Sequence, residues 1–483
     1  MLATAASRTM LVVVIVGTSV SVRRGAGEDL KKEALATAKR ATRFLVEQVS
    51  TRGGYLWRYS SDLKLREGEG VVRTETVWVQ PPGTPAVGEA FVRLFQATGD
   101  RQFLEAARLA ADALRQGQMR SGGWQDRVEF EPRLRRRWAY RTEPPGRKRK
   151  DQSSLDDDKT QSAIRFLIRL DAAEHFQNAA VHEMTLYALK GLIERGQFPN
   201  GAFPQVWTDT SRERAPAGIR KASYPKQWPR QYPGHREYWL KYTLNDNLMP
   251  DVIRTLFLAA DTYHEAAYEQ AALRAADFLL AAQMPEPQPA WAQQYDYDMH
   301  PIWARKFEPP AVTGGESQGV LRILMEVYRR TGDAKYLKPI PAALAYLSRS
   351  RLPDGRLARF YELRTNRPLY FNRRYELTYD DADMPTHYGF KVASHLDELR
   401  REYDELSASS GRARDSSRGA ARGPRRVSQA RVREIVESLD PRGAWVTEGG
   451  LKYHRRSGPV IEMQVAVRHL NLLADFLAGS DRP

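Results

Sequence analysis

The feature that most constrains the fold is a turn that recurs between segments with helical spacing of apolar residues. Two copies of this turn fit the pattern Gln-x-x-x-Gly-x-aromatic, at Gln118–Gly122–Trp124 and at Gln197–Gly201–Phe203. The helical segments come in pairs and cover Asp29–Val49, Ala86–Ala97, Arg101–Arg115, Asp158–Ala172, Gln177–Arg195, Met249–Asp261, His264–Gln283, Ser317–Arg330, Leu337–Arg349, His387–Leu406 and Pro459–Ala478. Repeated units of this kind stack to complete a shared core. We therefore predict an all-α fold, an α/α toroid of helical hairpins with long decorated loops that form the functional face.

Few segments favour strands, and those that do are short, such as Val77–Val79 and Arg359–Tyr361. The glycine and the aromatic residue of the recurring turn need no role beyond a tight turn packed under a ring. The predicted parts of the chain are a signal peptide (1–27), the toroid (28–406), a basic low-complexity insertion or linker (407–434) and a C-terminal turn with a closing helix (435–483).

The N-terminus has one Arg before an apolar run from Met10 to about Val22. This run is too short to span a bilayer and is typical of the central region of a secretory signal. A short membrane anchor or a misassigned start codon is the alternative. Since no other segment is apolar enough to span a membrane, we expect a soluble mature protein that is secreted or periplasmic.

Composition excludes several classes of protein. Hydrophobic residues make up 42% of the chain and charged residues 28%, as in globular proteins. The absence of cysteine excludes disulfides, thiolate metal sites and thiol nucleophiles. Most of the net charge of +16 comes from two basic runs, 133–150 and 411–433. Such runs are usually solvated loops, and neither contains the interleaved aromatics of a nucleic-acid-binding module, so we expect no nucleic-acid partner.

Two loops place polar oxygen atoms directly before a helix. The first is Asp156-Asp157-Asp158, and the second is Asn245-Asp246-Asn247. One or two such residues would cap a helix, but three carboxylates repel one another unless a cation lies between them. Ca²⁺ prefers clustered carboxylate and amide oxygens. At equivalent places in a repeated fold, the two loops would face each other across the mouth of a toroid, although capping alone also explains each of them.

Two further loops combine cations with aromatic rings, PAWAQQYDYDMHPIWARKFEPPAVTGGES and GRLARFYELRTNRPLYF. Aromatic rings stack on sugar faces and guanidinium groups pair with uronate carboxylates, so these loops suit an acidic polysaccharide. Loops held together by salt bridges and ring packing are the alternative. The chain contains no P-loop, dinucleotide fingerprint, Gly-x-Ser-x-Gly or His-Glu-x-x-His motif.

Six motifs occur in an order that resembles the family 10 polysaccharide lyases, the pectic acid lyases. They are SLDDDKTQSAIRFL, GQFPNGAFPQVW, YTLNDNLM, PAWAQQYD, WARKFEPPAVTGGES and LARFYELRTNRPLYF, within about residues 40–400. The resemblance implies a divergent α/α-toroid enzyme that cleaves polygalacturonate by Ca²⁺-assisted β-elimination. In that reaction the bound ion acidifies the proton at C5, an arginine removes it, and the C4–O4 bond breaks.

By motif position, the resemblance assigns the base to Arg305, with Lys306 either a neighbouring cation or a partner of Glu308. It assigns Asp156 both a catalytic role and a place in the Ca²⁺ site, beside Asp157, Asp246 and Asn245. The expected substrate-binding residues are Trp303, Lys306, Asp296, Arg359, Arg364 and Arg367. We expect a monomer that binds an acidic polysaccharide.

The chain also departs from the family pattern. The family has Asp-Asn where this chain has Asp156-Asp157, and YDDADMPTHYGF stands where a basic closing motif is expected. Two alternatives to a lyase remain. The first is an α/α-toroid glycoside hydrolase, in which Asp156 and Asp246 would form an acid–base pair roughly 5–10 Å apart. The second is a catalytically inactive carbohydrate-binding homologue.

Overall fold

The structure is a computed structural model that describes residues 20–73, 75–146, 148–208, 216, 218–409 and 427–479. Most of the predicted signal peptide therefore lies outside the described residues, and helix α1 begins at Val20. Residues 410–426 of the predicted linker also lie outside them, between helices α11 and α12. Within the described ranges, no helix has the length and apolarity needed to cross a bilayer.

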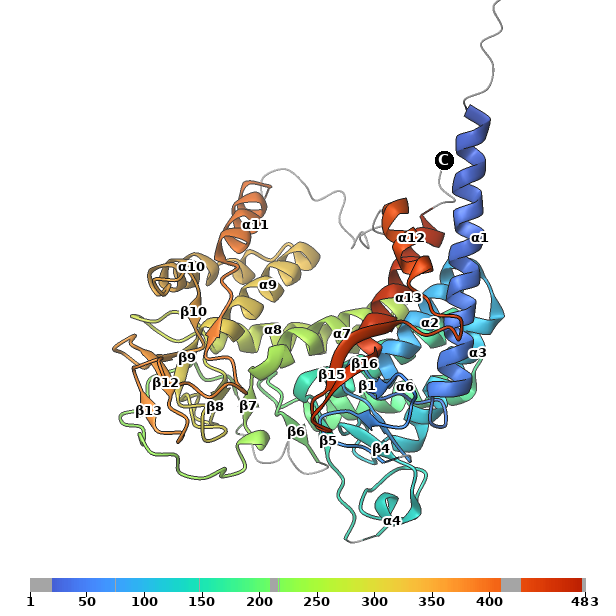
Figure 1. Cartoon of the computed structure of the whole chain (residues 1–483). Coiled ribbons are helices and arrows are strands. Elements are labelled where there is room, and N and C mark those ends of the chain that lie inside the picture. The colour runs from blue at the N-terminus through green and yellow to red at the C-terminus, as the bar shows by residue number, and fades with distance from the viewer. Residues whose placement is uncertain are drawn as a thin grey trace, which may run out of the picture.

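The helices form hairpins arranged in an arc (Figure 1). Their bounds are α1 (Val20–Phe44), α2 (Thr84–Thr98), α3 (Arg101–Gly117), α4 (Pro132–Arg135), α5 (Lys159–Ala173), α6 (Ala179–Gly191), α7 (Leu248–Tyr263), α8 (Ala266–Ala281), α9 (Gly314–Thr331), α10 (Ile340–Arg349), α11 (Leu396–Ser409), α12 (Gln429–Glu437) and α13 (Met463–Ala478). One row consists of α13, α2, α5, α7 and α9 in that order, each packed on the next, while α3, α6, α8 and α10 pack against their hairpin partners. This arrangement confirms the predicted all-α toroid class.

The C-terminal helix returns to the start of the chain. Helix α13 packs on both α1 and α2, next to the first hairpin. Figure 1 shows the toroid open on one side, with α9 and α11 facing α12 and α13 across the opening.

The recurring turn has a structural role that explains its sequence. In the second copy, the Gln197 side-chain amide donates to Gly201 O at 3.2 Å and to Ala271 O of α8 at 2.8 Å. The Gln118–Gly122 turn makes the same pair of contacts with its own carbonyl and with α6. Gly201 has a φ of +92°, and a Cβ there would lie 2.1 Å from Arg274 O. Only glycine fits a turn that approaches the next hairpin so closely.

Short antiparallel strands connect the helices on the loop face. They are β1 (Arg58–Ser60), β2 (Arg66–Glu67), β3 (Thr76–Trp78), β4 (Arg127–Glu129), β5 (Ser153–Ser154), β6 (Val206–Trp207), β7 (Tyr242–Thr243), β8 (Gln294–Tyr295), β9 (Ala311–Thr313), β10 (Leu357–Ala358), β11 (Phe360–Glu362), β12 (Pro368–Phe371), β13 (Leu377–Thr378), β14 (Lys391–Val392), β15 (Val446–Leu451) and β16 (Arg456–Glu462). Two four-stranded sheets have the orders β15-β16-β1-β2 and β13-β12-β11-β9, and the other strands form pairs.

Two predicted helix starts differ from the structure because strands occupy them. Residues expected to begin a helix at Pro459 belong to β16, which pairs with β15 and β1. The apolar run in VIEMQVAV continues from the strand into α13, so periodicity alone does not separate the two elements. The helix predicted from His387 begins at Leu396, since β14 pairs with β10 before it.

Two apolar clusters support the loop face. The larger one runs through the helices and includes the fully buried indole rings of Trp124, Trp207 and Trp291. The smaller one surrounds Trp303 and the rings of Phe360 and Phe371, beneath the strands β9, β11 and β12. Each of these strands is only three or four residues long and forms few ladder hydrogen bonds. The packing of this cluster therefore helps to hold the loops above it in place.

Candidate active site

The two acidic loops have the same backbone conformation. The 3₁₀ turn η2 (Asp156–Asp158) precedes α5, and the 3₁₀ turn η6 (Asn245–Asn247) precedes α7. In both, the second and third residues have positive φ angles, 47° and 61° in η2 and 51° and 57° in η6. Left-handed backbone at a residue with a side chain costs energy and often marks a functional site. Because α5 packs on α7, the two turns come into contact.

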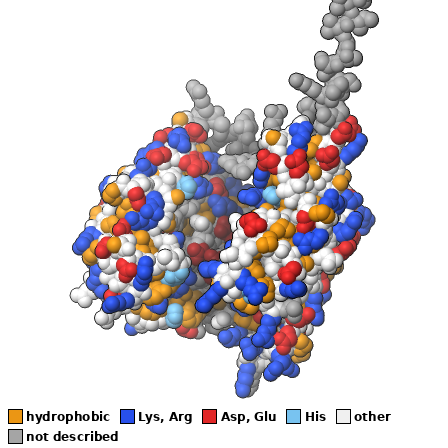
Figure 2. All heavy atoms as spheres, in the orientation of Figure 1, with side chains coloured by type: hydrophobic (Ala, Val, Ile, Leu, Met, Phe, Trp, Pro, Cys, Tyr) orange, Lys and Arg blue, Asp and Glu red, His pale blue; other side chains and the backbone are white. Residues whose placement is uncertain are grey.

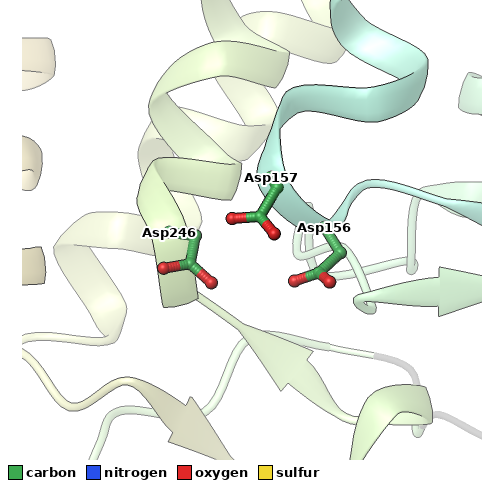
Figure 3. A group of neighbouring side chains, drawn as sticks. All are labelled: Asp156, Asp157 and Asp246. Carbon is green, nitrogen blue, oxygen red and sulfur yellow. The ribbon is translucent and has the colours of Figure 1, made fainter. Parts of the chain in front are cut away.

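Three carboxylates meet at this contact. Asp156, Asp157 and Asp246 each offer one oxygen, and the three oxygens lie within 4.8 Å of one another (Figure 3). Burial, together with the charge of Asp156, raises the pKa of Asp157 to about 6. Burial and the charges of Asp157 and Asp156 raise the pKa of Asp246 to about 8. Two of the three carboxylates therefore resist ionisation when no cation is present.

The third Asp of the first loop has a different role. The Asp158 carboxylate turns to α5 and pairs with Arg165 NH2 at 2.5 Å. It is therefore a structural residue at the start of the helix, where it pairs with a helix cation and accepts no backbone N–H as a cap would, whereas Asp156 and Asp157 point to Asp246.

Each carboxylate of the cluster accepts one hydrogen bond from a side-chain amide: Gln205 donates to Asp156 at 2.6 Å, Gln80 to Asp157 at 3.0 Å and Asn245 to Asp246 at 2.5 Å. Within the part of the chain that the structure describes, the oxygen atoms of these three amides are buried and have no hydrogen-bond partner. Burying a hydrogen-bond acceptor without a partner costs free energy. A hard cation such as Ca²⁺ would satisfy these atoms, because it binds both carboxylate and amide oxygens. The donor set therefore fits Ca²⁺.

Lys159 makes Asp156 different from its neighbours. Its Nζ lies 2.9 Å from Asp156 Oδ2. Burial by itself would raise the pKa of Asp156, but the charge of Lys159 and the hydrogen bonds from Lys159 and Gln205 hold it below its usual value. Asp156 is thus the carboxylate of the cluster that stays ionised.

Arg305 is held by a buried carboxylate. Its Nε and NH2 lie 2.9 and 2.5 Å from the two oxygens of Glu308, which is only 2% exposed. Tyr388 donates to the same carboxylate at 2.9 Å. Burial disfavours the charged guanidinium, but the bond to Glu308 outweighs it and raises the pKa of Arg305. In this arrangement Arg305 is a cation, and its charge favours the ionised form of all three cluster carboxylates, although burial and the neighbouring carboxylates still leave the pKa of Asp157 and of Asp246 raised.

The other predicted cations divide into two groups. Arg359 lies beside the cluster, since its NH1 is 3.3 Å from Glu316, a residue whose charge also acts on Asp246. The Lys306 Nζ lies 3.5 Å from the Tyr375 ring centroid, so Lys306 is not the partner of Glu308.

Two arginines of the β11–β12 connection lie in a separate group. Arg364 packs on the ring of Tyr224 and Arg367 on the ring of Tyr379, at 5.2 and 3.4 Å from the centroids. Their contacts are with these aromatic side chains of the outer loops and not with the carboxylate cluster.

Trp303 and Asp296 line an adjoining cavity of about 400 Å³. Trp303 is 6% exposed, and its indole N–H donates to Pro229 O, so it forms a fixed wall. Asp296 shapes the turn that precedes Trp303, because its carboxylate accepts the backbone N–H of His300. Tyr238, another lining residue, connects the cavity with the cluster: burial and then the charge of Glu308 raise its pKa to about 12, and the charges of Arg305 and Asp156 also reach it.

Sequence reasoning missed several residues of this site. Gln205 and Glu308 lie inside motifs that carry the family resemblance, but nothing in those motifs shows that they bind Asp156 and Arg305. Gln80 has no sequence signal, because 77 residues separate it from Asp157. The fold brings Gln80 and Gln205 to the cluster, whereas the local loop conformation directs Glu308 to Arg305.

Residues 216–357 match the family model of pectic acid lyase, a range that includes Asp246 and Arg305 but neither Asp156 nor Arg359. No curated protein matches the chain.

Similar solved structures include a mutant family 10 polysaccharide lyase from Cellvibrio cellulosa in complex with trigalacturonic acid (21% identity, 68% of this chain and 98% of that chain, TM-score 0.45). A cellobiose 2-epimerase from Bacillus thermoamylovorans has 11% identity over 94% of this chain and 99% of that chain, with a TM-score of 0.45. A family 76 glycoside hydrolase (mannosidase) from Bacteroides thetaiotaomicron has 11% identity over 94% and 97%, with a TM-score of 0.42. The chain carries the sequence pattern of the pectic acid lyases over residues 216–357, which confirms the predicted resemblance to that family and includes three of the six motifs, YTLNDNLM, PAWAQQYD and WARKFEPPAVTGGES.

Proposed function

We propose that this protein is a polysaccharide lyase that cleaves polygalacturonate or a similar uronate polymer by Ca²⁺-assisted β-elimination. The observation that carries the proposal is the cluster of Asp156, Asp157 and Asp246, crowded enough to raise two pKa values and faced by the cation Arg305. The pectic acid lyase match over residues 216–357 supports the substrate class.

In the proposed site, the three carboxylates and the Asn245 amide hold Ca²⁺. Bound there, the ion would neutralise a substrate carboxylate and acidify the neighbouring C5 proton. The amide oxygens of Gln80, Gln205 and Asn245 lack partners, and an amide that turns by 180° presents its oxygen in place of its N–H₂. The site thus has more oxygen donors available than the three carboxylates alone.

Arg359 and Lys306 would bind uronate carboxylates, and Trp303 and Tyr238 would form the wall of an adjoining sugar subsite. Guanidinium groups suit this task because their planar fork matches a carboxylate. We place Arg364 and Arg367 farther along the bound chain, since they lie on the outer loops.

Arg305 is the proposed base. It can accept the C5 proton only as a neutral guanidine, and Glu308 opposes that state. The proposal therefore requires substrate binding to separate Arg305 from Glu308, after which burial disfavours the charge. The C5–H electrons then form the C4–C5 double bond, the C4–O4 bond breaks, and the leaving oxygen takes a proton from water.

A glycoside hydrolase is the second candidate, favoured by one observation. The pKa of Asp156 is low while that of Asp246 is raised to about 8, as in an acid–base pair. However, the cluster oxygens lie within 4.8 Å, closer than the carboxyl spacings of roughly 5–5.5 or 6.5–9.5 Å of retaining and inverting enzymes.

One experiment separates these candidates. Purified protein is incubated with polygalacturonate and Ca²⁺ while ultraviolet absorbance and reducing ends are measured together. A lyase raises both, a hydrolase raises reducing ends alone, and an inactive binding protein raises neither. An exported protein, as the N-terminal apolar run predicts, would meet such a polymer outside the cell.

A further inference from the structure

A basic lobe stands apart from the proposed site on the loop face. The lobe comprises the described residues 131–146 and 148–150, between β4 and β5, and includes the short helix α4. Figure 1 shows it projecting away from the helices, and Figure 2 shows Lys and Arg side chains at the lower end of the molecule, where it lies. None of the proposed catalytic or cation-binding residues belongs to it.

A buried cation holds the lobe in a fixed shape. Arg135 is 8% exposed and bonds to Glu143 Oε1 at 2.8 Å and to Glu129 O at 2.9 Å. Its guanidinium carbon also lies 4.9 Å from the ring centroid of Tyr140. Glu143 pairs a second time, with Arg149 at 3.5 Å. The lobe is therefore a built platform and differs from the loose solvated loop that its composition predicts.

The lobe has more exposed cations than its own acids neutralise. Within the described residues, five exposed side chains of the lobe form no ion pair: Arg133, Arg136, Arg137, Lys148 and Lys150. Like charges on so small a surface repel one another, and a polyanion relieves that repulsion. The lobe thus has the electrostatic character of a polyanion-binding surface.

The position of the lobe connects this surface with the carboxylate cluster. Lys150 precedes Asp156 by six residues, so their Cα atoms lie within roughly 20 Å even for an extended chain. The intervening strand β5 pairs with β6, and its Ser154 Oγ accepts the Asp156 N–H at 3.2 Å. A polymer bound in the site therefore has Lys150, where the lobe joins the loop face, within a few sugar units.

We propose that the basic lobe is a docking surface for the acidic polysaccharide and binds uronate units beyond those at the cluster. The inference rests on the proposed function for the identity of the polymer. A uronate chain is favoured over nucleic acid because the lobe offers few stacking rings: Tyr140 is fully buried, and Trp138 is partly covered.

The test compares two variants that lose the same number of charges. One changes the five unpaired lobe cations to Gln. The control changes five exposed cations on or next to the helices to Gln, each of which forms no ion pair with any described residue: Lys32, Arg43, Lys338, Arg401 and Arg433. Dissociation constants are measured with chelator present, which stops Ca²⁺-dependent turnover, for long polygalacturonate and for trigalacturonate, at low and at high salt. A thermal unfolding curve for each variant checks that it folds.

We expect the lobe variant to bind the long polymer about tenfold more weakly at low salt, which corresponds to about 1.4 kcal/mol. The difference should shrink at high salt, where exposed charges are screened. Binding of the trimer should stay unchanged, and the control variant should resemble the wild type with both ligands.

Equal polymer binding by the lobe and control variants would overturn the inference. A lobe variant that loses binding of single-stranded nucleic acid but keeps that of polygalacturonate would overturn it as well. The lyase proposal has its own test, the formation of an ultraviolet-absorbing product. Because dissociation constants do not depend on turnover, the absence of that product would contradict the lyase proposal without deciding the docking surface.

Discussion

Asp246→Asn should make the Ca²⁺-free protein more stable at pH 8 and remove its stabilisation by Ca²⁺. The wild-type carboxyl has a pKa of about 8 in the folded protein, against an ordinary value of 3.8. Since folding raises this pKa, the unfolded chain loses its proton first, and stability falls as the pH rises from about 4 to about 8. Asn has no proton to lose, so the variant does not lose stability over this pH range. Asn also tolerates the positive φ of 51° at this position.

The difference of about four pH units corresponds to about 5 kcal/mol at 1.36 kcal/mol per unit. Asp246 is partly exposed, so solvent screening reduces the expected gain to about 2–3 kcal/mol. For a chain of this length, that gain raises the melting temperature by about 2–3 °C. The assay is thermal unfolding followed by circular dichroism at pH 5 and pH 8, with chelator and with Ca²⁺.

Asp158→Asn is the matched control, because it changes the neighbouring acidic residue and breaks the pair with Arg165. Breaking this partly buried pair leaves the charge of Arg165 less well compensated, so the variant should be less stable at both pH values and keep its response to Ca²⁺. The reasoning is refuted if Asp246→Asn melts below the wild type at pH 8 in chelator, or if Ca²⁺ stabilises it as strongly as the wild type.

Three further predictions concern the base and the fold. Arg305→Ala should lower kcat by about 10²–10⁴-fold yet leave Ca²⁺ binding intact, so undiminished turnover would dispose of the assigned base. If Arg305 is the base, kcat should rise at alkaline pH as Arg305 loses its proton. Glu308→Gln should move this rise to lower pH, because the neutral amide no longer raises the pKa of Arg305; an unshifted profile would exclude Arg305 as the titrating group. Gly201→Ala should lower the free energy of unfolding by about 2–4 kcal/mol in urea, since its Cβ would meet Arg274 O at 2.1 Å; a smaller loss would contradict the proposed role of the turn.

The sequence is informative where the chain repeats itself. The Gln197–Gly201 turn and its earlier copy indicate stacked hairpins, and the structure has them. The Asp156 and Asp246 loops were expected to face each other because each precedes a helix of a repeated unit, and this is where the structure places them. Both inferences depend on the spacing of residues that are near one another in the sequence. That spacing is visible directly in the apolar periodicity and in the residue types of the loops.

Partners that the local spacing does not specify could not be predicted in this way. Nothing near Gln80 indicates Asp157, and the pairing of Arg305 with Glu308 requires a side-chain direction that spacing leaves open. The β15–β16 hairpin was missed for another reason. Its apolar residues run without a break into α13, so one pattern covers a strand and a helix.

The most direct test of the central claim is the initial rate of ultraviolet absorbance increase on polygalacturonate, measured over a Ca²⁺ titration for the wild type and for Asp246→Asn. We predict that the wild-type rate rises with Ca²⁺ and stops in excess chelator. The variant should need far more Ca²⁺ or remain inactive, because the cluster loses one of its three carboxylates. A wild-type rate that ignores chelator, or a variant with the wild-type Ca²⁺ dependence, would contradict the assignment of this cluster as the Ca²⁺ site of a lyase.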